Sequence, residues 1–184
     1  IFSCIKEAGK DDYELIVIAP DKEAEQTVRY FQKVNPRVSY LKDESKGKPA
    51  AVNLAVAKAQ GDLLMFTDGD VFVGNNSIRK LLAPLEQDEK VGAVSGHAVP
   101  QDSRDTKFGF WAHILTQAGA HEMRLQRVAE GKSIEASAYL MAVRKSLIEP
   151  LPEDTFADDQ LISYMVLKKD YRIVYAPDAL VFVK

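Results

Sequence analysis

Cysteine is nearly absent from this 184-residue chain, which contains Cys4 alone. One cysteine forms no internal disulfide and leaves no ligand set for a structural zinc site, which fits a reducing compartment. Long hydrophobic runs are also missing, since no apolar stretch reaches the ~20 residues that a membrane helix requires. Low-complexity tracts and Pro/Gly-rich linkers are absent too, so the sequence predicts one domain over residues 1–184.

A strong charge of either sign is lacking as well. The chain has 24 Lys and Arg residues against 27 Asp and Glu residues, which gives a net charge of -3 at pH 7. Its basic residues are scattered and form no concentrated positive stripe of the kind that binds a nucleic-acid backbone. Nucleic acid is therefore not an expected partner.

The chain also lacks an initiator methionine. Residues 1–9 place Phe2, Ile5 and Ala8 along one side of an amphipathic helix, and Leu180–Lys184 has the pattern of an apolar strand. Both ends resemble interior elements of a domain. We therefore expect a fragment of a longer protein.

Apolar strands and amphipathic helices alternate along the chain. In the first half the expected elements are strand 14–19, helix 22–33, strand 38–41, helix 49–59 and strand 63–67. The second half adds strand 91–99, helix 107–128, strand 136–143, helix 158–169 and strands 171–175 and 179–183. The alternation is typical of β-α-β units. It predicts an α/β fold with a mixed, mainly parallel sheet that helices flank on both faces.

Carboxylates follow two of the predicted strands. Asp21 comes after the first strand, and Asp68, Gly69 and Asp70 follow a later one. Ligands of such sheets bind beyond the carboxyl ends of the strands, so these acids are candidates for one shared site. Asp68 and Asp70 can turn toward one hard cation, Mg²⁺ or Mn²⁺, which prefers oxygen ligands. The alternative is an Asp-Gly turn that caps a helix beginning near Asn76.

A glycine between two lysines precedes another predicted helix. Lys46, Gly47 and Lys48 come before Pro49, which suits the first helical turn. Backbone N–H groups at a helix N-terminus attract phosphate, and the lysines would add to that attraction. The glycine spacing is not that of a P-loop. The alternative interpretation is a solvated basic loop.

Two adjacent acids, Asp158 and Asp159, open the predicted helix 158–169. The helix dipole favours acids in the first turn, so capping accounts for at least one of them. Paired carboxylates also suit general-base catalysis, in which one removes the proton of an attacking hydroxyl. The three histidines have no carboxylate at metal-ligand spacing and are expected to pack or to lie on the surface. The aromatic residues of helix 107–128 are either core or a platform for an acceptor sugar; they are Phe108, Phe110 and Trp111.

Taken in order, these segments resemble family 2 glycosyltransferases, inverting nucleotide-sugar transferases of the GT-A fold. The resemblance is carried by Ala19–Asp21, Lys46–Asn53, Gly61–Asp70, Val91–Gly96, Ala138–Arg144, Phe156–Asp159 and Tyr171–Pro177. They cover nearly the whole chain. By this resemblance, the family's first strand would precede Ile1 and its Gln-x-x-Arg-Trp segment would follow Lys184, which leaves processivity open.

The resemblance implies a catalytic domain that moves a sugar from a nucleotide-diphosphate donor, a UDP-sugar, to a hydroxyl of a glycan or lipid-linked acceptor. Asp70 and Asp68 would hold Mg²⁺ or Mn²⁺ in a DxD motif, and Asp159 would be the catalytic base. The implied donor contacts are Asp21, Lys46, Gly47, Lys48, Asn53, Asp68 and Gly69. A cytoplasmic location is also implied, at the membrane face if segments outside this chain attach it there.

Two other classes remain open. A non-catalytic or degenerate sugar-nucleotide-binding domain is favoured by the missing first strand. A phosphohydrolase with an aspartyl nucleophile also carries Asp-x-Asp after a strand. That class expects Thr or Val as the second residue after the motif, where this chain has Phe72.

Overall fold

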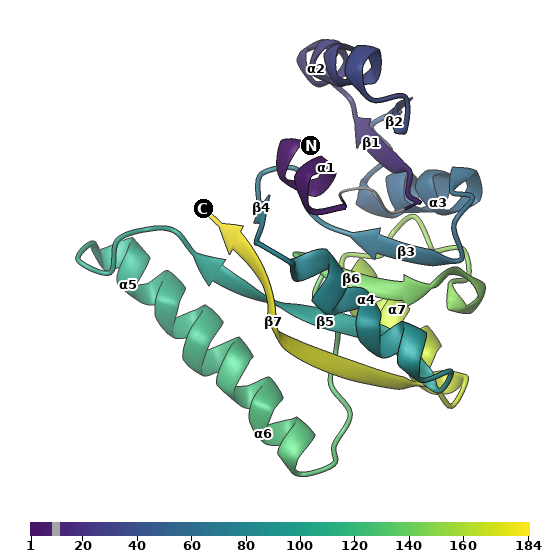
Figure 1. Cartoon of the computed structure of the whole chain (residues 1–184). Coiled ribbons are helices and arrows are strands. Elements are labelled where there is room, and N and C mark those ends of the chain that lie inside the picture. Colours follow the sequence, from purple (N-terminus) through teal and green to yellow (C-terminus); the bar gives the residue numbers. More distant parts are fainter. Residues whose placement is uncertain (9–11) are drawn as a thin grey trace.

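The computed structural model of the protein describes residues 1–8 and 12–184, whose strands form two sheets (Figure 1). The strands are β1 (Leu15–Ala19), β2 (Val38–Lys42), β3 (Leu63–Phe66), β4 (Phe72–Val73), β5 (Val91–Pro100), β6 (Met141–Arg144) and β7 (Arg172–Val183). One sheet is five-stranded with the order β3-β6-β5-β7-β4. The other pairs β1 with β2 in parallel.

Helices connect and cover these strands. They are α1 (Phe2–Ala8), α2 (Lys22–Val34), α3 (Lys48–Lys58), α4 (Ser77–Gln87), α5 (Lys107–His113), the π-helical segment η1 (Ile114–Glu122), α6 (Met123–Ala129), the short 3₁₀ turn η2 (Lys145–Leu147) and α7 (Asp158–Lys168). In the part of the chain that the structure describes, none of these helices has the length and apolarity to cross a membrane.

The expected mixed α/β architecture is confirmed, with more antiparallel pairing than the sequence indicates. β5 and β7 are parallel, whereas β6 is antiparallel to both β3 and β5, and β4 is antiparallel to β7. It follows that β3, β5 and β7 share one direction. β6 and β4 run in the opposite direction. β6 therefore forms antiparallel pairs with β3 and β5 on its two sides, and β4 forms one with β7 at the edge.

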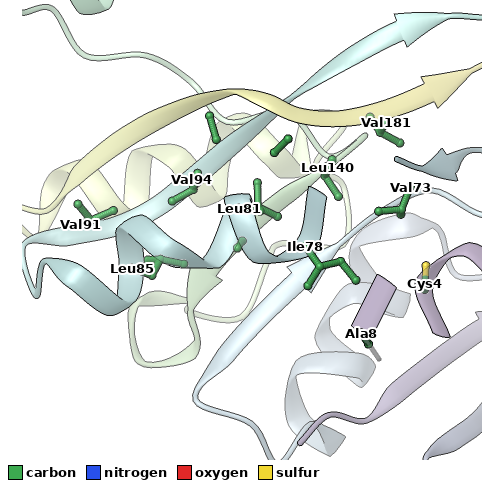
Figure 2. Packing of buried hydrophobic residues seen from close by; sticks show 13 residues of the cluster. Cys4, Ala8, Val73, Ile78, Leu81, Leu85, Val91, Val94, Leu140 and Val181 are labelled. Carbon is green, nitrogen blue, oxygen red and sulfur yellow. The ribbon is translucent and has the colours of Figure 1, made fainter. Parts of the chain in front are cut away.

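Apolar residues cover both faces of the five-stranded sheet, as alternation along β5 and β6 requires. Val94 and Ala142 belong to a cluster under α4 and α1, and their neighbours Ala93 and Val143 belong to a second cluster with α3 and α7. Figure 2 shows the first cluster, in which the fully buried Leu81 of α4 lies over β5. Helices therefore flank both faces, as expected.

The helix expected at 107–128 is one continuous rod of α5, η1 and α6 beside the sheet (Figure 1). The Thr106 hydroxyl caps its start by accepting from the Gly109 N–H at 3.0 Å. Phe108, Phe110 and Trp111 are 86%, 50% and 52% exposed. Their interpretation as core residues is therefore wrong, and they form an exposed aromatic surface.

Other elements differ from the expectation in their bounds. A single strand, β7, replaces the two strands expected on either side of Pro177. β5 pairs with β7 along this length, with a register shift between Ser95 and His97. β6 begins only at Met141. In α1 the buried side chains are Cys4 and Ala8, while Phe2 is exposed, and Gly9 lies outside the described residues.

A cavity of about 1160 Å³ lies between the two sheets. Apolar residues of β1, β3 and α3 line most of it, and α1 and α4 add to the lining. The charged residues of its lining include Lys48, Asp68 and Asp158. Among the described residues, β1 pairs with β2 alone and β3 with β6 alone, so both strands keep an unpaired edge.

Candidate functional site

Lys48 is the first residue of α3 and lies where the glycine loop becomes a helix. Gly47, the N-cap, has φ 98°, a left-handed conformation that residues with a Cβ rarely adopt. Pro49 follows in the first turn, where its missing N–H costs nothing. This local sequence directs the Lys48 side chain away from the loop and toward the acids described below.

Two carboxylates from distant parts of the chain contact the Lys48 ammonium. Lys48 Nζ lies 3.2 Å from Asp68 Oδ1 and 3.6 Å from Asp158 Oδ2. Partial burial alone would lower the pKa of Lys48, but the charges of Asp158 and Asp68 outweigh it and raise that pKa above its ordinary value. The lysine is therefore held as a cation between the end of β3 and the start of α7.

The Asp68–Asp70 motif follows β3 in an exposed turn. Thr67 fixes the strand end, because its hydroxyl donates to the Tyr139 carbonyl at 2.8 Å. Asp68 turns inward to Lys48, whereas Asp70 is exposed. The alternative of a helix cap is wrong, because α4 begins after β4 with Asn76 as its N-cap.

Asp158 and Asp159 occupy the first two positions of α7 and have different surroundings. The N-cap is Ala157, so neither acid holds the expected capping position. Asp158 is buried against Lys48. Asp159 accepts hydrogen bonds from the Gln160 N–H at 2.9 Å and the Ala138 N–H at 3.3 Å. Asp159 is thus oriented by backbone groups and carries no ion pair with Lys48.

Three of the other expected donor-binding residues are engaged elsewhere. Asp21 caps α2 by accepting from the Ala24 N–H at 2.7 Å. Lys46 pairs with Glu44 at 2.7 Å on the exposed loop. Asn53 bonds to the main chain of one loop residue through both ends of its carboxamide. The structure therefore brings together Lys48, Asp68 and the acid pair, and leaves Asp21 and Lys46 in capping and loop contacts.

A divalent cation fits the donor set after β3. Within residues 1–8 and 12–184, no group of three or more His, Cys, Asp or Glu side chains is arranged to hold a metal ion. Two carboxylates, Asp68 and Asp70, are nevertheless enough for Mg²⁺, which is commonly bound by one or two carboxylates together with water and substrate phosphates. The donor chemistry thus suits a cation that arrives with a phosphate-bearing ligand.

Sequence reasoning missed the backbone groups that shape this site. The Ala138 N–H orients Asp159, and the Tyr139 carbonyl accepts from Thr67. Main-chain donors and acceptors are the same in every residue, so they leave no side-chain signal. Their only sequence clue is that residues 138–144 belong to the segments that resemble the family.

The side chains near the start of α3 have the chemistry to bind a ligand that carries both phosphate and hydroxyl groups. A helix N-terminus and a lysine attract phosphate, and two carboxylates offer oxygen ligands to a cation. A further carboxylate, Asp159, lies at the start of α7 next to Asp158, which contacts Lys48. Phosphate binding and proton removal are therefore both possible within one region.

Known proteins are similar to this chain in sequence or in fold. An N-acetylglucosaminyltransferase of Rhizobium meliloti (strain 1021) is 28% identical over 199 residues, which cover 97% of this chain and 46% of that protein. The chain thus spans about half the length of this relative. The structure of this chain resembles that of a Pyrobaculum calidifontis mannosyltransferase in complex with GDP-Man and Mn²⁺. The TM-score is 0.72 at 23% identity, over 97% of this chain and 50% of the mannosyltransferase chain.

A second solved structure, GalNAc-T7 with UDP, GalNAc and Mn²⁺, gives a TM-score of 0.65 at 19% identity over 92% of this chain and 37% of that chain. These likenesses establish the expected GT-A fold. The profile of Glycosyl transferase family 2 matches residues 1–151, well over half of the chain. This chain therefore belongs to glycosyl transferase family 2.

Proposed function

We propose that this chain is the donor-binding and catalytic region of an inverting glycosyltransferase that uses a UDP-sugar and a divalent cation. The observation that carries the proposal is the contact of Lys48 with both Asp68 and Asp158. It joins a phosphate-attracting helix start, a carboxylate motif and an acid pair from three separate parts of the chain. Relatives named N-acetylglucosaminyltransferase support N-acetylglucosamine as the sugar.

The donor's diphosphate would lie beside the N-terminus of α3. There the Lys48 ammonium and the backbone N–H groups at the start of the helix, apart from Pro49, which has none, would attract the phosphates. Asp68 and Asp70 would hold Mg²⁺ or Mn²⁺, which supplies positive charge for the departing nucleoside diphosphate. Both solved neighbours contain Mn²⁺, which supports this choice of cation.

Asp159 is proposed as the general base. An ionised carboxylate has room for about four hydrogen bonds, and Asp159 uses two of these positions for backbone N–H groups. Its carboxylate takes the proton of the acceptor hydroxyl while the acceptor oxygen forms a bond to the anomeric carbon. The bond from that carbon to the diphosphate oxygen breaks on the opposite face, so the anomeric configuration inverts. The exposed rings of Phe108 and Trp111 offer an acceptor sugar a stacking surface.

Calorimetric titration with UDP and Mn²⁺ tests the binding half of this proposal. The unaltered protein should show Mn²⁺-dependent heat, and Asp70→Ala should lose it because one of two carboxylate ligands is gone. Asp178→Ala is the matched control, since Asp178 is an exposed aspartate of β7. Heat that is absent from the unaltered protein would favour a non-catalytic domain.

Release of UDP from UDP-N-acetylglucosamine tests the chemical half. Asp159→Asn should keep the Mn²⁺-dependent binding of UDP and lose turnover by 10²–10⁴-fold, roughly the contribution of a positioned base. Normal turnover in this variant would contradict the assignment of the base and direct attention to Asp158.

A further inference from the structure

The side chain of Asn53 forms a two-bond clamp with the main chain of Leu151. Asn53 Nδ2 donates to the Leu151 carbonyl at 2.8 Å, and the Leu151 N–H donates to Asn53 Oδ1 at 2.8 Å. The partners are 98 positions apart in sequence. Both hydrogen-bonding ends of the carboxamide are thereby used inside the protein.

The chemistry around Leu151 explains why a side chain is needed there. Pro150 and Pro152 flank Leu151, and neither can donate a backbone hydrogen bond. The Asn53 carboxamide has the donor and acceptor of a peptide group, so it pairs with Leu151 as a neighbouring strand would. Leu151 itself is 3% exposed and packs in the cluster shared by α3 and α7.

The clamp ties together the two elements that carry the candidate site. Asn53 lies five residues after Lys48 in α3, about 7.5 Å along the helix. Leu151 begins the segment that leads into α7, and a Thr155 N–H to Pro152 carbonyl bond of 3.1 Å folds the segment between them. The acid pair opens α7 immediately afterwards.

We infer that Asn53 is a positioning residue, which places Asp158 and Asp159 relative to Lys48 by holding Leu151, and that it does not bind the donor directly. The inference rests on the function proposed above. Leu151 takes one hydrogen-bonding position at each end of the Asn53 carboxamide, and this two-point pairing fixes the plane of the amide against the loop, with one N–H and one lone pair left over. The clamp links α3 to the segment that leads into α7, and the Lys48–Asp158 ion pair is a separate link from α3 to the first residue of α7.

Asn53→Ala tests the inference against a matched control. Ser77→Ala also removes a buried side-chain contact to the main chain, because Ser77 Oγ accepts from the Leu180 N–H at 2.8 Å, but it does so at α4 and β7. Both variants are compared at a temperature where each is fully folded. Turnover of UDP-N-acetylglucosamine and the affinity for UDP with Mn²⁺ are measured for each.

For Asn53→Ala we expect kcat to fall by 10- to 100-fold, roughly the effect of a 1 Å displacement of a reacting group, with the affinity for UDP and Mn²⁺ almost unchanged. Ser77→Ala should keep kcat. The opposite split in Asn53→Ala, weak UDP binding with normal turnover, would make Asn53 a donor ligand and overturn the inference. An equal loss of kcat in both variants would also overturn it, since the effect would then be general destabilisation.

Asn53→Asp refines the test, because aspartate keeps the acceptor for the Leu151 N–H and places a carboxylate oxygen against the Leu151 carbonyl. We expect kcat to fall in this variant too.

Hydrogen exchange at the Leu151 amide provides a readout that needs no activity: exchange should accelerate in Asn53→Ala and stay slow in Ser77→Ala. Unchanged protection in Asn53→Ala would overturn the clamp. An unaltered protein that releases no UDP would instead contradict the proposed function and leave the exchange result standing.

Discussion

At the scale of single residues, the two lysines of the glycine loop have different surroundings. Lys48 lies between Asp68 and Asp158, whereas Lys46 pairs with Glu44 on the surface. The sequence alone treats them as equivalent neighbours of Gly47. The left-handed glycine and the helix start separate them, because Lys48 belongs to α3 and reaches Asp68 and Asp158, while Lys46 stays on the loop.

This difference gives a paired prediction. Lys48→Met should weaken the binding of UDP with Mn²⁺ by about 10- to 100-fold, because a charge-assisted contact to phosphate is lost while the apolar stem is kept. Lys46→Met should change the affinity little, since its ammonium is engaged by Glu44 in solvent. Calorimetry at one fixed ionic strength makes the comparison. Similar losses in both variants would show that the loop attracts the donor only through its overall charge.

Much of the candidate site could be predicted from residue type and position. The strand ends predicted one shared site for Asp21 and Asp68, and the resemblance added Lys48. The structure brings Lys48 and Asp68 into contact, whereas Asp21 caps α2. The role of Asn53 could not be predicted, because its partner Leu151 lies 98 residues away and takes part through its main chain. Long-range contacts to backbone groups leave no pattern in the sequence.

At the scale of elements, η1 holds the long helix to the sheet through a polar cluster. His121 of η1 stacks on His97 of β5, with ring centroids 3.9 Å apart and an interplanar angle of 5°. Gln117 contacts His97 Nε2 at 3.0 Å, and the Tyr175 hydroxyl contacts His121 Nδ1 at 2.6 Å. Arg124 lies over the Tyr175 ring. A second positive charge in this cluster would therefore be unfavourable.

This cluster predicts a loss of stability in acid. Burial, followed by the neighbouring His121, lowers the pKa of His97 below its ordinary value. The unfolded chain therefore binds this proton first as pH falls below about 6.5, so the free energy of unfolding decreases there, by about 1 kcal/mol for each unit of pKa shift. Chemical denaturation at pH 8 and pH 5 measures the decrease. His121→Phe keeps a ring and removes the neighbouring imidazole, so it should show a smaller decrease; the same decrease as in the unaltered protein would assign the effect to burial alone.

Most helices and strands could be predicted from periodicity, but two local features could not. The widened π-helical turns of η1 depend on contacts with the sheet, and an apolar pattern alone does not distinguish them from an α-helix. Two strands were expected at 171–175 and 179–183, yet β7 is continuous through Pro177, with a shift in register against β5. Tertiary pairing thus outweighs the local signal of proline.

At the scale of the whole molecule, the two sheets should differ in local stability. Residues 91–97 of β5 are buried, whereas β1 and most of β2 are only half-buried and pair with each other alone among the described strands. Native-state hydrogen exchange should therefore show weaker protection in β1, β2 and α2 than in β5, β6 and β7, because local opening follows the number of buried contacts. Equal protection in both sheets would show that they open together.

The position of β6 also affects how this protein folds during synthesis. β6 lies between β3 and β5, and its pairing joins Leu63 to Arg144. A ribosome must therefore release residues up to about 144 before β3, β6 and β5 can pair, and the rest of β7 before the five-stranded sheet is complete. Until then the edges of β3 and β5 that face β6 have no partner, and they are the surfaces on which nascent chains would associate. Slower elongation between β5 and β6 would lengthen this exposed interval, while a pause after Arg144 would allow β3, β6 and β5 to pair before α7 and β7 are made.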